Sequence, residues 1–302
     1  STPIKSSAAS DVYKRQIKNR KFLMDKLIDD LIKLAFAEDI GDGDHTTLCC
    51  IPENAMGKSK LLIKEEGILA GVEMAQRIFK DFDPNLKMEI FIKDGTAVKP
   101  GDIAFTVEGK VRSLLQTERL MLNVMQRMSG IATVTNKYVK RLEGLHTRIL
   151  DTRKTTPGLR MIEKAAVKIG GGVNHRIGLF DMILLKDNHI DFAGGIEKAI
   201  TRAKEYLKEK GKDLKIEIEV RNMDELEEVM RIGGIDRIML DNFTPELTRK
   251  AVKRIGGKYE TESSGGITFD TIRDYAECGV DFISVGALTH SVKGLDMSFK
   301  AC

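Results

Sequence analysis

Five cationic side chains occur in three short segments of the second half of the chain. They are Arg153, Lys154, His175, Arg176 and Lys186. Like charges gathered in one place repel one another unless an anionic ligand offsets the repulsion. If the fold brings these segments together, they predict a ligand that carries several negative charges. Any one of them alone is more often a solvated charge at the rim of a domain, so the prediction depends on the set.

Glycine-containing turns and two acidic residues complete the set. Ser264-Gly265-Gly266 and Gly286-Ala287-Leu288-Thr289 each follow a strand-like run and lead toward a helix. Glycine lets the backbone approach a ligand closely, and the N–H groups at a helix N-terminus favour a phosphate. Ordinary turns are the alternative interpretation. Glu219 and Asp241 end two further strand-like runs, where the alternative is a salt bridge with a neighbour.

The elements that must position these residues alternate along the second half of the chain. Strands are expected at 148–150, 182–185, 216–220, 237–240, 259–262 and 282–285. Helices are expected at 162–169, 196–210, 223–232, 245–255 and 268–278. This alternation predicts a parallel sheet with right-handed crossovers, and six or more units favour a βα barrel, complete or incomplete, over an open sheet. Catalytic groups of such barrels lie at the C-terminal ends of strands, so the candidate residues would share one mouth.

The first half of the chain has a different pattern. Helices are expected at 21–37 and 74–82, a long helix or helix pair at 113–142, and short strands at 58–63, 67–72, 88–91 and 102–108. This predicts a small α+β domain. Residues 1–16 lack periodicity and the apolar stretch of a secretory signal, so they are expected to be a disordered or expression-derived tail. The acidic run Glu38–Asp44 lacks EF-hand spacing and is interpreted as a structured turn.

Composition excludes several classes of protein. The chain has 302 residues, of which 42% are hydrophobic and 31% charged, which suits one large domain or two unequal ones. The net charge of +4 is mild, and the absence of Trp argues against nucleic-acid binding. No apolar run reaches the roughly 18 residues of a membrane span. No GxGxxG follows a strand, which argues against a dinucleotide-binding fold. The four cysteines show no metal-ligand spacing, which predicts thiols in a reducing, cytoplasmic compartment.

The motifs that carry the candidate residues resemble, in order, those of the quinolinate phosphoribosyltransferase family, also called nicotinate-nucleotide pyrophosphorylase (carboxylating). They are Glu-Asp-Ile-Gly-Asp-Gly-Asp-His-Thr-Thr (38–47), Thr-Glu-Arg-Leu-Met-Leu-Asn (117–123), Asp-Thr-Arg-Lys-Thr-Thr-Pro-Gly-Leu-Arg (151–160), Gly-Gly-Gly-Val-Asn-His-Arg-Ile-Gly-Leu (170–179), Leu-Lys-Asp-Asn-His (185–189), Glu-Ile-Glu-Val (217–220), Leu-Asp-Asn-Phe (240–243), Ser-Ser-Gly-Gly-Ile (263–267) and Val-Gly-Ala-Leu-Thr-His-Ser (285–291). The resemblance covers the chain from about Lys21 to its end. It implies an α/β fold with an N-terminal α/β sandwich domain over 17–118, joined by 291–302, and an incomplete, seven-stranded βα barrel over 119–290.

The resemblance also implies an activity. Phosphoribosyl would pass from phosphoribosyl pyrophosphate (PRPP) to quinolinate with decarboxylation, giving nicotinate mononucleotide, pyrophosphate and carbon dioxide in de novo NAD biosynthesis. The competing readings are a paralogue that uses another substrate, such as the molybdenum-transport-associated relative or a nicotinate phosphoribosyltransferase, and a non-catalytic phosphate-binding barrel. The full basic set favours quinolinate, and the intact carboxylate pair argues against mere phosphate binding.

The roles implied for single residues follow the same resemblance. Arg153, Arg176 and Lys186 would hold quinolinate, with Arg119 arriving from a partner subunit. Thr152, Lys154 and His175 would face the substrate anions. Glu219 and Asp241 would bind ribose hydroxyls, with Mg²⁺ carried by PRPP nearby. Ser264, Gly265, Gly266 and Gly286 would surround the 5-phosphate. Lys154, Glu219 and Asp241 are the implied catalytic residues.

A homodimer, or a higher oligomer of dimers, is the expected assembly, with neither nucleic acid nor membrane as a partner. Arg119 precedes the barrel, lies on the helix that begins near Gln116 and is not at the end of any strand. It is therefore expected to serve a neighbouring subunit, and a local pair with Glu118 is the alternative.

Overall fold

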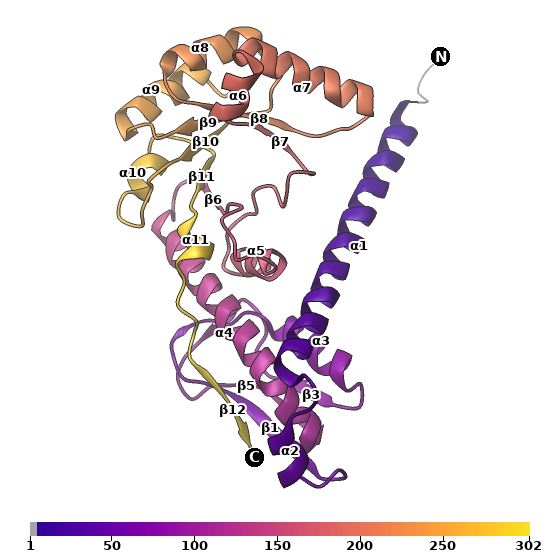
Figure 1. The fold of residues 1–302 in the computed structure, drawn as a ribbon. Helices are drawn as coiled ribbons and strands as arrows, with labels where there is room; N and C mark the ends of the chain where they lie inside the picture. Colours follow the sequence, from indigo (N-terminus) through magenta and orange to yellow (C-terminus); the bar gives the residue numbers. More distant parts are fainter. Residues whose placement is uncertain (1–4) are drawn as a thin grey trace. The chain divides into compact units, whose positions relative to one another are not determined.

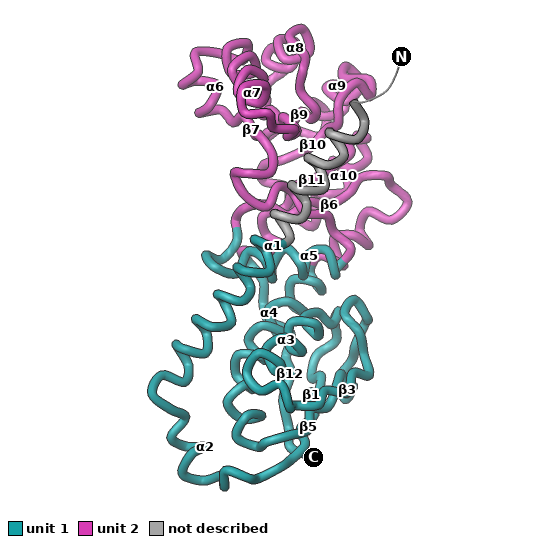
Figure 2. Tube along the Cα trace, turned by 90° about the vertical axis from the view of Figure 1, so that its right-hand side faces the viewer, with its two compact units in different colours: residues 1–134, 155–170, 291–302 teal, residues 135–154, 171–290 magenta. Residues whose placement is uncertain are grey.

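The structure, a computed structural model, describes the backbone of residues 5–302 and the side chains of residues 22–302. The chain forms two compact units (Figure 2). The first contains residues 1–134, 155–170 and 291–302, and the second contains residues 135–154 and 171–290. Of the segment expected as a tail, residues 1–4 lie outside the described chain, whereas a helix begins at Lys5.

The first unit is built on a four-stranded antiparallel sheet in the order β12-β1-β5-β3. Its strands are β1 (Met56–Ile63), β3 (Lys87–Ile90), β5 (Ile103–Lys110) and β12 (Met297–Ala301), and a separate pair joins β2 (Gly67–Ile68) to β4 (Ala97–Val98). Its helices are α1 (Lys5–Ile40), α2 (His45–Cys50), α3 (Val72–Phe82), α5 (Arg160–Ile169) and most of α4 (Val111–Arg141). The expected helix or helix pair at 113–142 is therefore one continuous helix.

The core of this unit lies where α3 packs on the sheet. Ala75, Ile78 and Phe79 are buried at helical spacing along one face of α3. The Phe79 ring meets Phe105 of β5 and Phe299 of β12 at centroid distances of 6.2 and 6.0 Å. Each such buried aromatic side chain stabilises the fold by about 1.5–3 kcal/mol relative to an exposed one. The strand β12 is thus tied to this unit by pairing and by packing.

The second unit contains a parallel sheet of six strands in the order β6-β11-β10-β9-β8-β7 (Figure 1). The strands are β6 (Arg148–Leu150), β7 (Ile183–Leu185), β8 (Ile216–Val220), β9 (Arg237–Asp241), β10 (Glu260–Ser264) and β11 (Phe282–Ser284). On the outer side of β6, Val173 adds a single parallel bridge to Leu150. The expected α/β class with a barrel-type parallel sheet is confirmed; the sheet has six strands, and Val173 forms the rudiment of a seventh.

Helices follow most strands of the second unit. They are α6 (Asp187–Ala193), α7 (Ile196–Lys210), α8 (Met223–Ile232), α9 (Pro245–Ile255), α10 (Ile272–Ala276) and α11 (Ala287–His290). Asn222 and Thr244 cap α8 and α9 by accepting backbone N–H groups, which fixes where those helices begin. The helix expected at 268–278 is shorter, and α6 was not expected. Among the described residues, no helix has the length and apolar character needed to cross a bilayer.

Candidate active site

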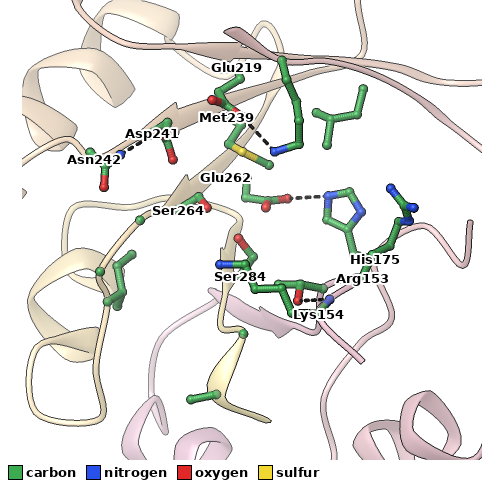
Figure 3. A pocket seen from close by; sticks show the side chains of 18 of the residues that line it. Arg153, Lys154, His175, Glu219, Met239, Asp241, Asn242, Glu262, Ser264 and Ser284 are labelled. Atoms are coloured by element: carbon green, nitrogen blue, oxygen red, sulfur yellow. Dashed lines mark hydrogen bonds and ion pairs between the residues drawn. The ribbon is translucent and has the colours of Figure 1, made fainter. Parts of the chain in front are cut away.

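A pocket of about 860 Å³ opens at the C-terminal ends of the strands of the second unit (Figure 3). Every residue that lines it belongs to that unit. All the site residues expected from the sequence line this pocket except Arg119. The parallel sheet explains this convergence, because all its strands end at the same edge.

The cationic residues form one wall of the pocket. Arg153 and Lys154 are exposed just after β6, whereas Arg176 is buried and donates from Nη1 to the carbonyl oxygen of Met182 at 3.3 Å. Burial and the nearby charge of Arg153 lower the pKa of Arg176. The two guanidinium groups therefore repel each other in the protein as it stands, and an anion between them would relieve that repulsion.

The two carboxylates of the pocket come from neighbouring strands. Glu219 on β8 accepts a hydrogen bond from Lys186 Nζ at 3.2 Å, which joins a residue expected to bind quinolinate to one expected to bind ribose. Asp241 ends β9 and accepts a hydrogen bond from Asn242 Nδ2 at 2.6 Å. Burial raises the pKa of both carboxyls, against the lowering effect of Lys186. Figure 3 shows Glu219 and Asp241 on the side of the pocket opposite Lys154.

The glycine turns differ in how strongly they require glycine. Gly265 has a φ of 94°, and a Cβ there would overlap the side chain of Asn242 and lie 2.9 Å from its backbone nitrogen. Gly266 has a φ of 62°, yet a Cβ would meet nothing within 4 Å. At Gly286 a Cβ would lie 3.1 Å from atoms of His290 and Lys154.

The helices that follow these turns are short. The helix α10 has five residues and begins well after Gly266, and α11 has four residues. Helices this short have a weak dipole. The backbone N–H groups of the turns themselves are therefore the better candidates for contacting a phosphate.

His175 lies where the pocket meets the barrel interior, and protein atoms engage both ring nitrogens. Its Nδ1 accepts the backbone N–H of Arg176 at 2.7 Å. Its Nε2 lies 3.0 Å from Glu217 Oε2 and 3.4 Å from Glu262 Oε2. The backbone N–H of His175 donates to Asp151 Oδ1 at 2.9 Å. The imidazole is thus held from several sides.

The acidic partners of His175 were missed by the sequence analysis. Glu217 and Glu262 are fully buried, on β8 and β10. The alternation in Ile216–Val220 was an available signal, because side chains two residues apart in a strand point to the same side. If Glu219 faces the interior of the barrel, Glu217 must do so as well.

Charges in this interior shift the ionisation of all three groups. Although burial opposes it, the two carboxylates raise the pKa of His175 to about 9. Burial and the charge of Glu262 raise the pKa of Glu217 to about 7. Burial also acts against ionisation of Glu262, but hydrogen bonds from His175 and Ser284 and the charge of Arg237 hold the pKa of Glu262 below its usual value. Glu262 is thus the carboxylate that stays ionised.

Two places in this region offer metal-ligand atoms. Within residues 22–302, His175, Glu217 and Glu262 have ligand atoms within 4.8 Å of one another. Arg237 Nη1 already lies 3.1 Å from Glu262 Oε2, so the guanidinium of Arg237 supplies the positive charge that a metal ion would bring to these carboxylates. On the pocket side, two carboxylates without a closed cage suit Mg²⁺, which usually keeps waters and binds partly through substrate phosphates.

Arg119 stands apart from the other expected residues. It is exposed on α4, in the part of that helix that belongs to the first unit. Its expected role requires a second chain and remains a prediction.

Comparison with known proteins agrees with these features. Residues 44–129 match the family model of the quinolinate phosphoribosyl transferase N-terminal domain, and residues 131–300 match that of its C-terminal domain. The chain is 46% identical over 285 residues to the chloroplastic nicotinate-nucleotide pyrophosphorylase (carboxylating) of Arabidopsis thaliana, covering 89% of this chain and 81% of that protein. The solved structure of NadC from Streptococcus pyogenes is 41% identical, with a TM-score of 0.85 and coverage of 90% of this chain and 95% of that one. This chain belongs to the quinolinate phosphoribosyl transferase family.

Proposed function

We propose that the protein transfers phosphoribosyl from PRPP to quinolinate with loss of carbon dioxide, giving nicotinate mononucleotide and pyrophosphate. The observation that carries this proposal is the pocket itself. It sets a cationic wall, with Arg153 close enough to lower the pKa of Arg176, against the carboxylates Glu219 and Asp241. A dianionic pyridine suits the first feature, and a ribose that becomes positively charged suits the second.

Quinolinate would bind at the cationic wall. Its two planar carboxylates suit bidentate pairing with Arg153 and Arg176. Lys186 would provide a third contact, and it must then share its ammonium with Glu219 or release that partner. Thr152 and Lys154 lie in the same loop and would complete this side of the site.

PRPP would bind across the other strands. Glu219 and Asp241 would accept hydrogen bonds from its ribose hydroxyls, and the turns at Ser264–Gly266 and Gly286 would contact the 5-phosphate. Lys154 lies beside Gly286, close enough for its ammonium to reach an anion held there. The pocket would thereby hold the anomeric carbon between the two substrates.

The reaction proceeds by breaking and forming bonds at that carbon. The bond to the pyrophosphate oxygen breaks, its electron pair leaves with pyrophosphate, and positive charge develops on the ribose near Glu219 and Asp241. The pyridine nitrogen then forms the new bond. The carbon–carbon bond to the adjacent carboxylate breaks next, the positive nitrogen stabilises the electron pair left on the ring carbon, and a proton replaces carbon dioxide. No covalent enzyme intermediate is needed.

Mg²⁺ is proposed as the cofactor, carried by PRPP, where it would neutralise the charge of the departing pyrophosphate. The two pocket carboxylates would suit such an ion, since both line the pocket in which PRPP would bind and both offer oxygen ligands. Turnover should therefore stop after exhaustive chelation and return with Mg²⁺ or Mn²⁺. Full activity in the chelated protein would contradict this part of the proposal.

We also propose a homodimer in which Arg119 of one chain completes the pocket of the other. The exposure of Arg119 in the first unit supports this, because an exposed guanidinium is available to a partner. A cytoplasmic location is proposed as well, supported by four free cysteines. The plant relatives carry chloroplastic or mitochondrial in their names.

One assay tests the proposed activity. The purified chain is incubated with PRPP and Mg²⁺ and with either quinolinate or nicotinate, and mononucleotide and carbon dioxide are measured together. The expected result is nicotinate mononucleotide with one carbon dioxide per turnover from quinolinate alone. Product from nicotinate without carbon dioxide would identify a paralogue with another substrate, and binding of PRPP without any product would indicate a non-catalytic barrel.

A further inference from the structure

A cluster of four charged or titratable side chains extends from the floor of the pocket, which His175 and Glu262 line, into the interior, and the reaction described above does not use it directly. It consists of His175, Glu217, Arg237 and Glu262, all of them buried. We call it the buried quartet. Burying charges is costly unless each has a partner, so a quartet at this depth needs a reason.

Three adjacent strands carry three members of the quartet, and His175 lies in the loop just after the bridge residue Val173. Glu217 on β8 lies opposite Arg237 on β9 in the strand register, and Glu260 lies opposite Arg237 on the other side, on β10. Glu262 follows two residues later on the same strand, and Arg237 Nη1 contacts its Oε2 at 3.1 Å. Arg237 therefore neutralises Glu262 directly.

Glu217 has a different partner. Its Oε2 lies 3.0 Å from His175 Nε2, the shortest of the contacts between the ring and the two carboxylates. Because the carboxylate has no exposed surface, water cannot solvate it in place of the ring. His175 and Glu217 thus form one close buried pair, while Arg237 pairs with Glu262 and with Glu260.

The ring of His175 connects the two buried carboxylates to the cationic wall of the pocket. While Nε2 faces the carboxylates, Nδ1 accepts the backbone N–H of Arg176 at 2.7 Å. Arg176 is the buried guanidinium of the cationic wall. Figure 3 shows His175 between Glu262 and the side where Arg153 lies. If the ring rotated, the backbone N–H of Arg176 would lose its acceptor. The backbone that carries the Arg176 side chain into the pocket could then shift.

We propose that Glu217 and Glu262 are positioning residues for the quinolinate site: they hold the His175 ring by Nε2 so that its Nδ1 fixes the backbone at Arg176. The ligand named here rests on the proposed function. The positioning itself is a property of the ligand-free protein. A preformed wall lowers the ordering cost of binding, so its loss should weaken quinolinate much more than PRPP.

The test uses substitutions that separate the His175 contact from the Arg237 contact. Glu217→Leu removes the shorter contact to the ring, and Glu217→Gln restores an oxygen that can accept the Nε2–H. Glu260→Gln is the matched control, because Glu260 pairs with Arg237 and Lys215 but with neither ring nitrogen of His175. Glu262→Gln weakens both contacts.

The expected kinetic result is a split between the two substrates. Glu217→Leu should raise the KM for quinolinate about tenfold or more, with the KM for PRPP changed by less than about twofold. Glu217→Gln should recover most of the loss, and Glu260→Gln should match the wild type. Equal effects on both substrates, or an effect of Glu260→Gln as large as that of Glu217→Leu, would overturn the proposal.

A measurement without substrate separates this inference from the proposed function. The chain has five histidines, so ¹⁵N imidazole spectra are tractable, and the His175 signals can be assigned by their loss in His175→Asn. The wild type should show a proton on Nε2 and a hydrogen-bonded Nδ1, and Glu217→Leu should lose this pattern. Unchanged ring signals in Glu217→Leu would refute the positioning role. A wild type with the expected ring signals but no turnover would refute only the proposed function.

Discussion

The rim of the pocket and the interior beneath it use charge in opposite ways. At the rim, Arg153 and Lys154 are exposed, and burial together with the charge of Arg153 lowers the pKa of Arg176. In the interior, Arg237 and Glu262 pair at 3.1 Å and His175 lies 3.0 Å from Glu217. The rim therefore carries surplus charge for a ligand, whereas the protein satisfies its interior charges by itself. Substitutions at the rim should remove contacts with the ligand directly. Those in the interior should change stability and should affect quinolinate binding only through the alignment of the rim.

The largest expected effect is the loss of activity when Arg119 or Arg153 is removed. It tests whether Arg119 of a second chain is needed to complete the rim. Arg119→Ala and Arg153→Ala should each be nearly inactive. Mixed under exchange conditions, equal amounts should recover about a quarter of wild-type activity, since half the dimers are mixed and each mixed dimer has one intact site. Subunit exchange is verified with differently tagged chains. Verified exchange without recovered activity would show that Arg119 does not act on its neighbour.

The second effect compares the rim cations with a distant cation. Arg153→Ala, Arg176→Ala and Lys186→Ala should each weaken quinolinate binding by roughly 2–4 kcal/mol, because a substrate carboxylate loses a charge-assisted partner. PRPP binding should change much less. Lys250→Ala is the control, since Lys250 forms an ion pair with Glu246 on the surface of α9, away from the pocket residues. Calorimetric titration measures each affinity. Unchanged quinolinate affinity in all three rim variants would show that this wall does not bind the carboxylates of quinolinate.

The third effect compares two adjacent glycines, Gly265 and Gly266, in the turn proposed to contact the 5-phosphate. Gly265→Ala would drive a Cβ into Asn242, whereas Gly266→Ala adds only the cost of a positive φ, about 1–2 kcal/mol. We expect Gly265→Ala to raise the KM for PRPP by about tenfold or more and Gly266→Ala to raise it less. Steady-state kinetics with PRPP as the varied substrate measure which of the two variants has the higher KM. Equal effects would mean that the contact with Asn242 does not shape this turn.

The smallest effect tests the interior through pH. The raised pKa values of His175 and Glu217, about 9 and about 7, mean that the folded interior binds protons more tightly than the unfolded chain does. The Arg176 N–H at Nδ1 opposes a second ring proton, so we treat the pair as sharing one. Its stabilising effect is full below about pH 6.5 and is lost as the pH rises through 9.

Urea unfolding at pH 6.5 and pH 9 measures this effect. The wild type should lose on the order of 1–2 kcal/mol more stability over this range than His175→Gln, which has no titrating ring at this position. Parallel pH profiles of the two proteins would show that the pair does not hold this proton.

The sequence predicted regular elements best where local signals bounded them. The helices α7, α8 and α9 and the strand β8 begin and end where expected, because caps such as Asn222 and Thr244 and a glycine after each helix mark their limits. The short helix α6 spans seven residues, too few to show the apolar repeat of a helix, and it was not predicted. The strand-end rule placed the rim residues in one pocket. It could not show the buried quartet, because the pairing of Glu217 and Glu262 with His175 depends on how a loop folds over two strands that are far apart in the sequence.

The order of strands in the second unit has a consequence for synthesis of the chain. Within residues 5–302, the first strand of this sheet, β6, pairs with the last, β11, through Ile149 and Ile283, and otherwise forms only the bridge to Val173. Contacts between residues so distant in sequence form slowly, and on the ribosome they must wait for the later partner. Arg153 follows β6 and Gly286 follows β11, so the two ends of the pocket meet only when nearly the whole chain has emerged. A nascent chain that stops short of β11 holds most of the sheet without a closed substrate site.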